Sequence, residues 1–289
     1  MNLIRKKITV LVNSCDAYSD VWPLFFSALS DFWPDRPVKV VLNTENKSPN
    51  LGKDIIVTNF NKKGLNDSWG LRLIESLSKI ETEYVLAVYD DFILEADLNN
   101  EELEKILLKM DSDIDIAAVY LTKLGLETTE NTFLMTSRKE GNQYALLGDK
   151  VDYRLNSAPA IWRKKDLLAY TGIYDTPWAW EVFGTFRTFG DEKKIYCPHN
   201  KEKDIYQYNS KKGGAIYRGK WVREVVEDKN EKYNLNMDFT RRGFSIDIIS
   251  DKRSLKWKVD FLLLGYKMIG FNVFIFVYRM LKSKIAWKK

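Results

Sequence analysis

The first 121 residues alternate between short apolar runs and longer amphipathic stretches. The apolar runs have the length and β-branched content of buried strands, and they cover residues 8–13, 38–42, 55–58, 84–89 and 116–121. The stretches between them repeat apolar residues at helical spacing, which predicts helices over residues 20–32, from the capping segment 66–68 to about 78, and over 101–110. Strands that alternate with helices predict an α/β fold with a mostly parallel sheet and helices on both faces.

The second half of the chain has a less regular pattern. Residues 155–162 are predicted as a strand and residues 164–170 as a short helix, and a Trp-rich loop follows over 174–187. From Arg253 onward the pattern is helical. The predicted organisation is one α/β domain in two halves with a C-terminal amphipathic helical segment, which gives residues 1–125, 126–250 and 251–289.

The composition narrows the class of protein. The chain has 289 residues, of which 45% are hydrophobic and 29% charged, enough for a sizeable core. Its two cysteines, Cys15 and Cys197, predict no disulfide framework, and the N-terminal apolar run is too short for a signal peptide, so we expect a cytoplasmic protein. The only histidine is His199, which excludes HExxH and Cys₂His₂ metal sites.

Positive charge is concentrated at the C-terminus. Residues 252–289 carry ten Lys or Arg against one acid, Asp260, although the whole chain has a net charge of only +5. These basic residues alternate with Trp, Phe and Tyr and with apolar runs too short to span a bilayer. The pattern predicts a segment in the interface of an anionic membrane, and packing on the domain or on a second subunit, as in a homodimer, is the alternative. Nucleic-acid binding is not expected, because the basic residues are not gathered on a polar face.

Carboxylates follow two of the predicted strands. Asp16 comes shortly after the strand at 8–13, and Asp90 and Asp91 come directly after the strand at 84–89. Ligands of such sheets bind at the carboxyl ends of the strands, and paired carboxylates there suit Mg²⁺ or Mn²⁺ together with a diphosphate. The pair therefore predicts a divalent metal site, with a solvated turn as the alternative.

Residues 6–29 and 69–94 resemble the nucleotide-sugar half of GT-A glycosyltransferases, in the family-2-like group of bacterial surface polysaccharide enzymes. The resemblance implies that Asp16 contacts the nucleotide base and that Trp69 and Arg72 contact the nucleotide and the sugar. The Asp-x-Asp motif of the family corresponds to Asp90–Asp91, although the spacing differs here. We expect Asp91 at the metal and Asp90 toward the sugar.

The Trp-rich loop supplies a candidate general base. Glu181 has the position that the resemblance implies for the base of an inverting enzyme, and burial against Trp178 and Trp180 would raise its pKa. The same two rings could form a platform for the acceptor sugar. The alternative is that Trp178 and Trp180 are core residues and that Glu181 lies in the first turn of a helix.

Two further features have weaker signals. His199 follows a strand-like segment and could complete the metal site, although a surface position is the alternative. Residues 211–220 combine glycines with four basic residues and could close over a diphosphate, or form a solvated loop.

These features predict a membrane-associated glycosyltransferase. It would move a sugar from a nucleotide-diphosphate donor to a hydroxyl of a lipid-linked glycan, with inversion and with a divalent cation. A sugar-phosphate nucleotidyltransferase is one alternative, although residues 13–20 lack the Gly and Lys of its phosphate loop. A non-catalytic glycan-binding scaffold is the other.

Overall fold

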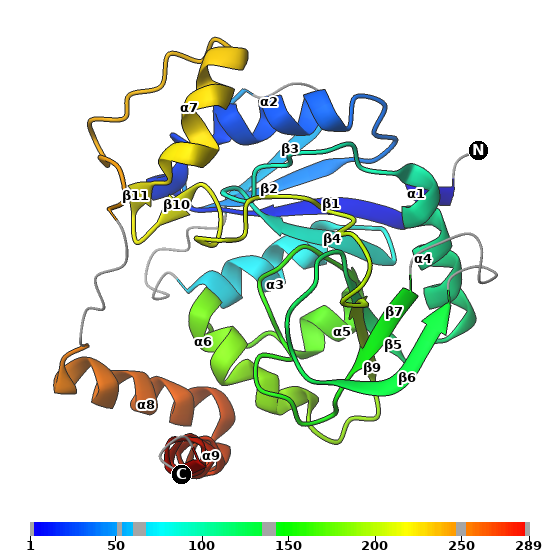
Figure 1. Cartoon of the computed structure of the whole chain (residues 1–289), viewed down its shortest axis with the longest axis vertical. Helices are drawn as coiled ribbons and strands as arrows, with labels where there is room; N and C mark the ends of the chain where they lie inside the picture. The colour runs from blue at the N-terminus through cyan, green and yellow to red at the C-terminus, as the bar shows by residue number, and fades with distance from the viewer. Residues whose placement is uncertain (1–2, 51–53, 60–67, 135–142, 247–252, 287–289) are drawn as a thin grey trace.

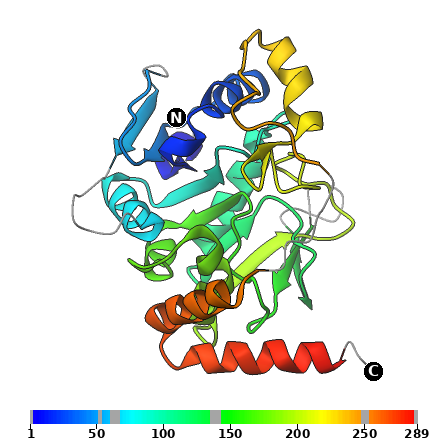
Figure 2. The same ribbon diagram turned by 90° about the vertical axis from the view of Figure 1, so that its left-hand side faces the viewer.

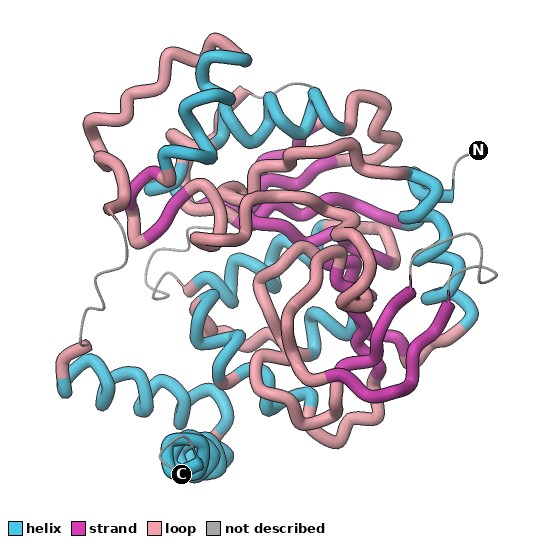
Figure 3. Tube along the Cα trace, viewed as in Figure 1, coloured by secondary structure: helices cyan, strands magenta, loops and turns pink. Residues whose placement is uncertain are grey.

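The computed structural model describes residues 3–50, 54–59, 68–134, 143–246 and 253–286. Figure 1 shows a layered α/β molecule, and in Figure 3 the strands run through its middle with helices on either side. Nine of the described strands form one sheet in the order β3-β2-β1-β4-β8-β5-β9-β7-β6. They are β1 (Ile8–Asn13), β2 (Val40–Thr44), β3 (Ile55–Asn59), β4 (Tyr84–Tyr89), β5 (Ile116–Tyr120), β6 (Thr128–Leu134), β7 (Gln143–Leu147), β8 (Ala160–Arg163) and β9 (Lys194–Pro198).

The two parts of the sheet differ in strand direction. Strands β3, β2, β1 and β4 are parallel to one another. Strand β8 is antiparallel to both β4 and β5, and β7 is antiparallel to both β9 and β6. The predicted mostly parallel sheet is therefore confirmed, with two reversed strands in its second part. A separate hairpin pairs β10 (Ile216–Tyr217) with β11 (Lys220–Trp221).

Helices cover both faces of the sheet, as predicted. One face packs on α2 (Trp22–Phe32), α4 (Asn100–Ser112) and α7 (Arg223–Lys232), and the other on α3 (Trp69–Lys79), α5 (Lys164–Ala169) and α6 (Pro177–Val182). Successive residues of β1 point to opposite faces, so Val10 and Val12 join the first core and Leu11 the second. The short helices α1 (Leu3–Lys7), η1 (Asp16–Tyr18) and η2 (Gly184–Thr188) complete this part.

Two helices end the described chain, as the helical pattern after Arg253 predicts. Helix α8 (Leu255–Ile269) and helix α9 (Asn272–Ala286) cross at one end of the molecule: Figure 1 shows α8 lengthwise and α9 end-on, and Figure 2 shows α9 lengthwise. A small separate core joins Phe183 to both helices. None of the described helices is long and apolar enough to cross a membrane.

The predicted elements of the first half agree with the structure within two residues. Strands β1 and β4 have the predicted bounds, and the side chain of Ser68 caps α3 by accepting the N–H of Leu71 at 3.2 Å. The other predicted capping residues, Asn66 and Asp67, lie outside the described residues. In the second half, the strand-like segment before His199 is β9, whereas β6 and β7 are not predicted and the predicted loop over 174–187 contains α6 and η2.

Strand β8 begins five residues later than predicted. The N–H groups of the preceding residues are taken by side chains instead of a neighbouring strand: Leu155 donates to Thr185 Oγ1 at 2.8 Å, Asn156 to the Tyr120 hydroxyl at 2.8 Å, and Ser157 to Glu181 Oε1 at 2.6 Å. The bond from Ser157 places Glu181, the predicted base, beside the start of β8.

Candidate active site

The Asp90–Asp91 pair lies at the carboxyl end of β4, beside the end of β1. Because Asn13 of β1 is in register with Tyr89 of β4, the residues that follow the two strands are neighbours. Ser14 donates its hydroxyl proton to Asp90 Oδ2, and the indole N–H of Trp22 lies 3.0 Å from the same oxygen. Asp90 is thus a buried acceptor, held by one residue after β1 and one from α2.

The two carboxylates are poorly compensated by the protein. Burial, followed by the charge of Asp91, raises the pKa of Asp90 well above its usual value. Burial also raises the pKa of Asp91 to about 7, although Arg242 acts in the opposite direction. Arg242 itself donates to both carboxylate oxygens of Asp20, at 2.6 and 2.7 Å. Within the described part of the chain, no Lys or Arg forms an ion pair with either member of the Asp90–Asp91 pair.

This environment fits a divalent cation. A hard cation would offset both the burial cost and the mutual repulsion of two adjacent carboxylates. Among the described residues no three His, Cys, Asp or Glu side chains are grouped to hold a metal. The protein would therefore supply two carboxylates at most, and phosphate oxygens and water the remaining ligands, as is common for Mg²⁺.

His199 is not brought to this pair. It follows β9, which is three strands from β4 in the sheet, or about 14 Å at the usual strand spacing. Its backbone N–H donates to Gln143 O at 2.8 Å, and its Nδ1 accepts the N–H of Lys201 at 3.3 Å. His199 is partly exposed, which fits the alternative of a surface position without a metal.

Asp16 fixes the loop that follows β2. Its carboxylate accepts the backbone N–H groups of Lys47 at 3.0 Å and Asn46 at 3.1 Å, and the side-chain amide of Asn46 at 3.1 Å. Burial raises the pKa of Asp16, but these donors outweigh that effect and the pKa is lowered. Asp16 therefore stays ionised at the same edge of the sheet as Asp90.

Trp69 and Arg72 lie in the first turn of α3 and are both buried. Arg72 Nη1 is 3.4 Å from Glu45 Oε1, and Glu45 also accepts the backbone N–H of Asp16 at 2.6 Å. The buried indole N–H of Trp69 has no hydrogen-bond acceptor among the described residues. Asp16 and Arg72 are therefore joined through the Glu45 carboxylate, and Trp69 lies in the same helix turn as Arg72.

Glu181 lies beside the start of β8, because it accepts the N–H of Ser157 and Ala160 pairs with Ala87 of β4. It lies on α6, whose first turn is capped by Thr176, and burial raises its pKa although the donors of Ser157 act against this. Tyr89 has a pKa that is raised first by burial and then by the charges of Glu181, Asp91 and Asp90. The charges of Asp91 and Glu181 also raise the pKa of Tyr208, after the larger effect of burial. The charges of Glu181 and Asp91 thus act on the same two tyrosines, Tyr89 and Tyr208.

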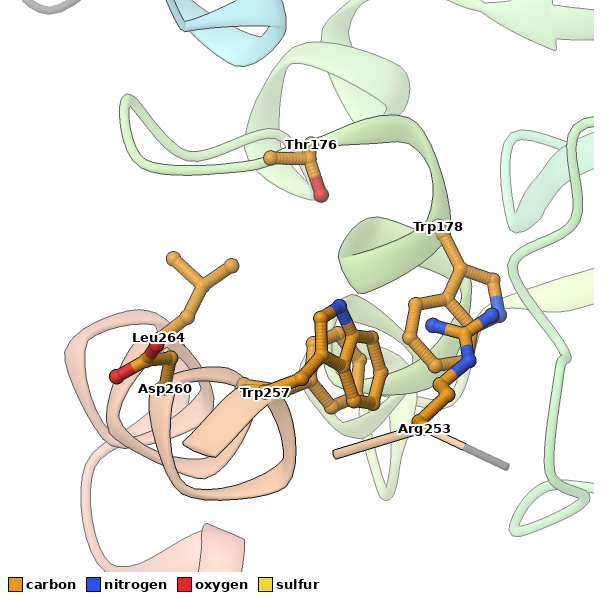
Figure 4. A pocket seen from close by; sticks show the side chains of 7 residues that line it. Thr176, Trp178, Arg253, Trp257, Asp260 and Leu264 are labelled. Atoms are coloured by element: carbon orange, nitrogen blue, oxygen red, sulfur yellow. The ribbon is translucent and has the colours of Figure 1, made fainter. Parts of the chain in front are cut away.

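Trp178 and Trp180 point in different directions. Trp180 is 3% exposed, packs on Trp69 and Trp162, and donates its indole N–H to Tyr170 O at 3.1 Å. It is a core residue and offers no ring face to an acceptor. Trp178 is 38% exposed and stacks on Phe261 of α8 at 4.2 Å, beside the hollow seen in Figure 4.

The glycine-rich loop reaches the Asp pair. The N–H of Ala215 donates to Asp91 O at 2.7 Å, and Gly214 has φ +122°. A Cβ at Gly214 would lie 2.6 Å from Asp91 O, so only glycine permits this approach. The backbone of the loop therefore lies against Asp91, whereas the side chain of Lys212 pairs with Glu224 at 3.4 Å.

Several residues of the site carry no sequence signal. Ser14, Trp22, Tyr89, Ser157 and Tyr208 stand in no spacing that would distinguish them from other polar or aromatic residues. Only the adjacency of Ser14 to the end of a predicted strand could have suggested one of them.

Comparisons with known proteins add a general likeness. No protein-family model matches the sequence, and no curated protein does. The chain is similar to S. aureus TarS 1–349, with 16% identity and a TM-score of 0.46 over 92% of this chain and 82% of that one. It is similar to the galactosyltransferase LgtC in complex with donor and acceptor sugar analogues, with 15% identity and a TM-score of 0.35 over 60% and 63%.

A third likeness is to the bifunctional IspDF from Campylobacter jejuni, with 11% identity and a TM-score of 0.37 over 70% of this chain. The chain spans about half of that protein, 52% of its length. All three TM-scores are below 0.5.

Proposed function

We propose that the chain is a nucleotide-sugar glycosyltransferase of the GT-A class, of the bacterial surface polysaccharide type. The observation that carries the proposal is the pair of adjacent, poorly compensated carboxylates at the end of β4, beside the start of β8, where Ser157 holds the partly buried carboxyl of Glu181. An acidic pair for a metal–diphosphate and a separate base are the two components that an inverting sugar transfer needs. Residues 1–125 would form the donor half and residues 126–250 the acceptor half.

The donor would bind at the carboxyl ends of β1 and β4. Asp16 would contact the base, Trp69 and Arg72 the nucleotide and sugar, and Asp90 and Asp91 would hold Mn²⁺ or Mg²⁺. When bound, the cation neutralises charge on the departing diphosphate. The basic residues of the glycine-rich loop beside Asp91 would add positive charge on the same side.

The acceptor would approach from the side of Glu181. One Glu181 oxygen takes the hydroxyl proton while the hydroxyl oxygen forms a bond to the anomeric carbon, and the bond from that carbon to the diphosphate oxygen breaks on the opposite face. The N–H of Ser157 holds the other end of the carboxyl, so the base keeps its orientation. A polar hollow of about 150 Å³, lined in part by Asn156 and Tyr208, lies next to this position. We place the acceptor on a lipid carrier at the inner face of the cell membrane.

The first test is thermal stability in the presence of nucleotide diphosphates, with and without Mn²⁺ or Mg²⁺. We expect one nucleotide to raise the Tm only with the metal, and we expect Asp91→Asn to lose this shift and sugar transfer from the matching donor. Asp97→Asn removes the same charge from an exposed position nearby and should retain both.

Two other results would contradict the proposal. Release of pyrophosphate from a nucleotide triphosphate and a sugar phosphate would identify a nucleotidyltransferase. Binding of glycan with no response to any nucleotide or metal would identify a scaffold.

A further inference from the structure

The C-terminal helices have a large apolar surface that nothing in the described chain covers. On α8 the exposed apolar residues recur at helical spacing and form one stripe: Leu255, Val259, Leu263 and Tyr266. A second stripe begins just before α9 and follows it: Phe271, Phe274, Ile275, Tyr278 and Leu281. These side chains are between 47% and 77% exposed, which is unusual for a contiguous apolar set.

The two stripes are continuous. The Tyr266 ring meets the Phe271 ring at 5.8 Å, and Phe271 meets Phe274 at 6.3 Å. Figure 2 shows both helices at one end of the molecule, with α9 outermost. The two stripes therefore meet at the turn between the helices and form an apolar surface larger than a small ligand covers.

The charge around this face favours an anionic partner. Residues 253–282 carry six Lys or Arg and one acid, Asp260, which pairs with Lys256. Lys258, Lys267 and Lys282 are exposed. A second copy of the chain would bring the same positive charge against this face, whereas an anionic bilayer would attract the charges and accept Phe, Tyr and Leu side chains at its interface.

The inner faces of the same helices pack on the helix that carries Glu181. Phe261 of α8 stacks on Trp178 at 4.2 Å and contacts Phe183 at 4.6 Å, and Phe276 of α9 meets Phe183 at 5.0 Å. A Cβ at Gly265 would lie 2.7 Å from the Phe183 ring, so glycine lets α8 approach this closely.

A polar contact and an aromatic cluster complete the connection. Arg187, which forms an ion pair with the buried Asp175, also donates to Met268 O of α8 at 3.3 Å. Figure 4 shows Arg253 over Trp178 beside Trp257, and the guanidinium lies 4.4 and 4.0 Å from the two ring centroids. Helix α6 is thus held between the sheet core, through Trp180, and the C-terminal helices, through Trp178.

We propose that the exposed faces of α8 and α9 dock on an anionic lipid bilayer and that docking holds α6, and with it Glu181, in position for transfer. The second part rests on the proposed function, and the first does not. The bilayer would then recruit the enzyme to a lipid-linked acceptor and also raise its activity on a soluble one.

The docking is tested by flotation with vesicles of phosphatidylcholine alone and of phosphatidylcholine mixed with phosphatidylglycerol. We expect binding to the mixed vesicles only, weakened by salt, and reduced about fivefold by each of Lys267→Gln and Lys282→Gln, which remove one positive charge each. Phe274→Ser/Tyr278→Ser should abolish binding. Leu108→Ser/Ile114→Ser removes apolar side chains of similar exposure from another surface and should leave it intact.

Equal binding to both kinds of vesicle would overturn the anionic preference. A dimer that the Phe274→Ser/Tyr278→Ser variant loses, without vesicle binding by the parent chain, would show that a second copy covers the face. Vesicle binding by a chain that transfers no sugar would uphold the docking and contradict the proposed function.

The coupling is tested with a water-soluble acceptor. We expect mixed vesicles to raise kcat several-fold for the parent chain and to have no effect on Phe274→Ser/Tyr278→Ser, whose activity without vesicles should be unchanged. Gly265→Ala should retain vesicle binding and lose the stimulation, with kcat lowered more than KM is changed. If vesicles bind and kcat stays the same, the bilayer recruits the enzyme without positioning Glu181, and the coupling is wrong.

Discussion

The two parts of the central sheet are built in different ways. In the part made of β3, β2, β1 and β4, neighbours are parallel, and α2 and α3 lie between β1 and β2 and between β3 and β4 in the chain. In the other part, β8 is inserted between β4 and β5, so Ala160 pairs with both Ala87 and Tyr120. The first arrangement follows from local alternation of strand and helix, and the second depends on pairings between distant segments.

The candidate site lies where these two parts meet. The Asp90–Asp91 pair ends the last strand of the regular part, whereas Ser157 and Glu181 belong to the inserted part. The proposed reaction divides in the same way, with donor and metal on the regular part and the base on the inserted part. Variants that affect one part alone can test this division.

The largest expected effect in the inserted part is that of Glu181→Gln. Loss of a general base lowers rates by about 10²- to 10⁴-fold, and Gln keeps an acceptor for the N–H of Ser157. We expect kcat to fall by that factor while the metal-dependent Tm shift with nucleotide, a property of the regular part, is retained. If Glu181→Gln lost the Tm shift as well as kcat, the regular and inserted parts of the sheet would not act separately.

The pH dependence gives a second measurement on the same residue. Burial raises the pKa of Glu181, so the acid limb of the kcat/KM profile should lie above the usual pKa of a glutamate and disappear in Glu181→Gln. For stability, a raised folded-state pKa means that the contribution of the neutral carboxyl is present below the unfolded pKa and is lost as the pH rises through the folded pKa. Glu181→Gln should therefore leave Tm at neutral pH unchanged or higher. A clear fall in Tm would contradict a raised pKa of Glu181 in the folded chain.

A smaller effect, on stability alone, is expected where the two parts join. Arg163 of β8 is buried and donates to Met110 O at 2.6 Å and to Ile116 O at 3.3 Å, so it bonds to the ends of the segment between α4 and β5. Arg163→Met leaves these carbonyls without that donor and should lower the free energy of unfolding by about 3 kcal/mol in a denaturant titration.

The partner carboxylate of Arg163 provides the control. Glu83 pairs with Arg163 at 2.7 Å but is half-exposed, so Glu83→Gln should cost less than about 1 kcal/mol. Equal losses from the two variants would place the stabilisation in the ion pair instead of the carbonyl contacts.

The smallest expected effect concerns a helix cap of the regular part. Asn99 Oδ1 accepts the N–H groups of Glu101 at 2.8 Å and Glu102 at 3.4 Å at the start of α4. Asn99→Ala should cost about 1 kcal/mol, and Asn99→Asp, which keeps an acceptor, should cost little. A loss of transfer activity in the folded Asn99→Ala chain would show that this cap affects the site as well as stability.

The residues explain how far prediction from sequence could go. The ends of β1 and β4 were predictable because an apolar run stops at a polar residue in each case, Asn13 and Asp90. Strand β8 was extended wrongly to residue 155, since Leu155–Ser157 have strand-like composition but direct their N–H groups to side chains from distant segments. The pattern of apolar residues along the chain does not predict hydrogen bonds to side chains from distant segments.

Trp178 and Trp180 show the same limit at the site. The two residues are two positions apart in a Trp-rich segment, and composition alone predicts the same role, acceptor binding, for each. Helix α6 directs Trp180 into the core and Trp178 toward α8. The role of each depends on which partner the helix meets on each side.

The sequence by itself determined the parallel part of the sheet, the carboxylates at its strand ends and the basic, aromatic character of the C-terminus, because strand length, helical period and charge are local properties of the chain. Only the tertiary structure decided that Ser157 holds Glu181, that Gly214 lies against Asp91, that His199 is three strands away, and that α8 packs on the helix of the base. Each of these depends on the packing of segments distant in sequence, and such packing is set by the shape and burial of the whole core.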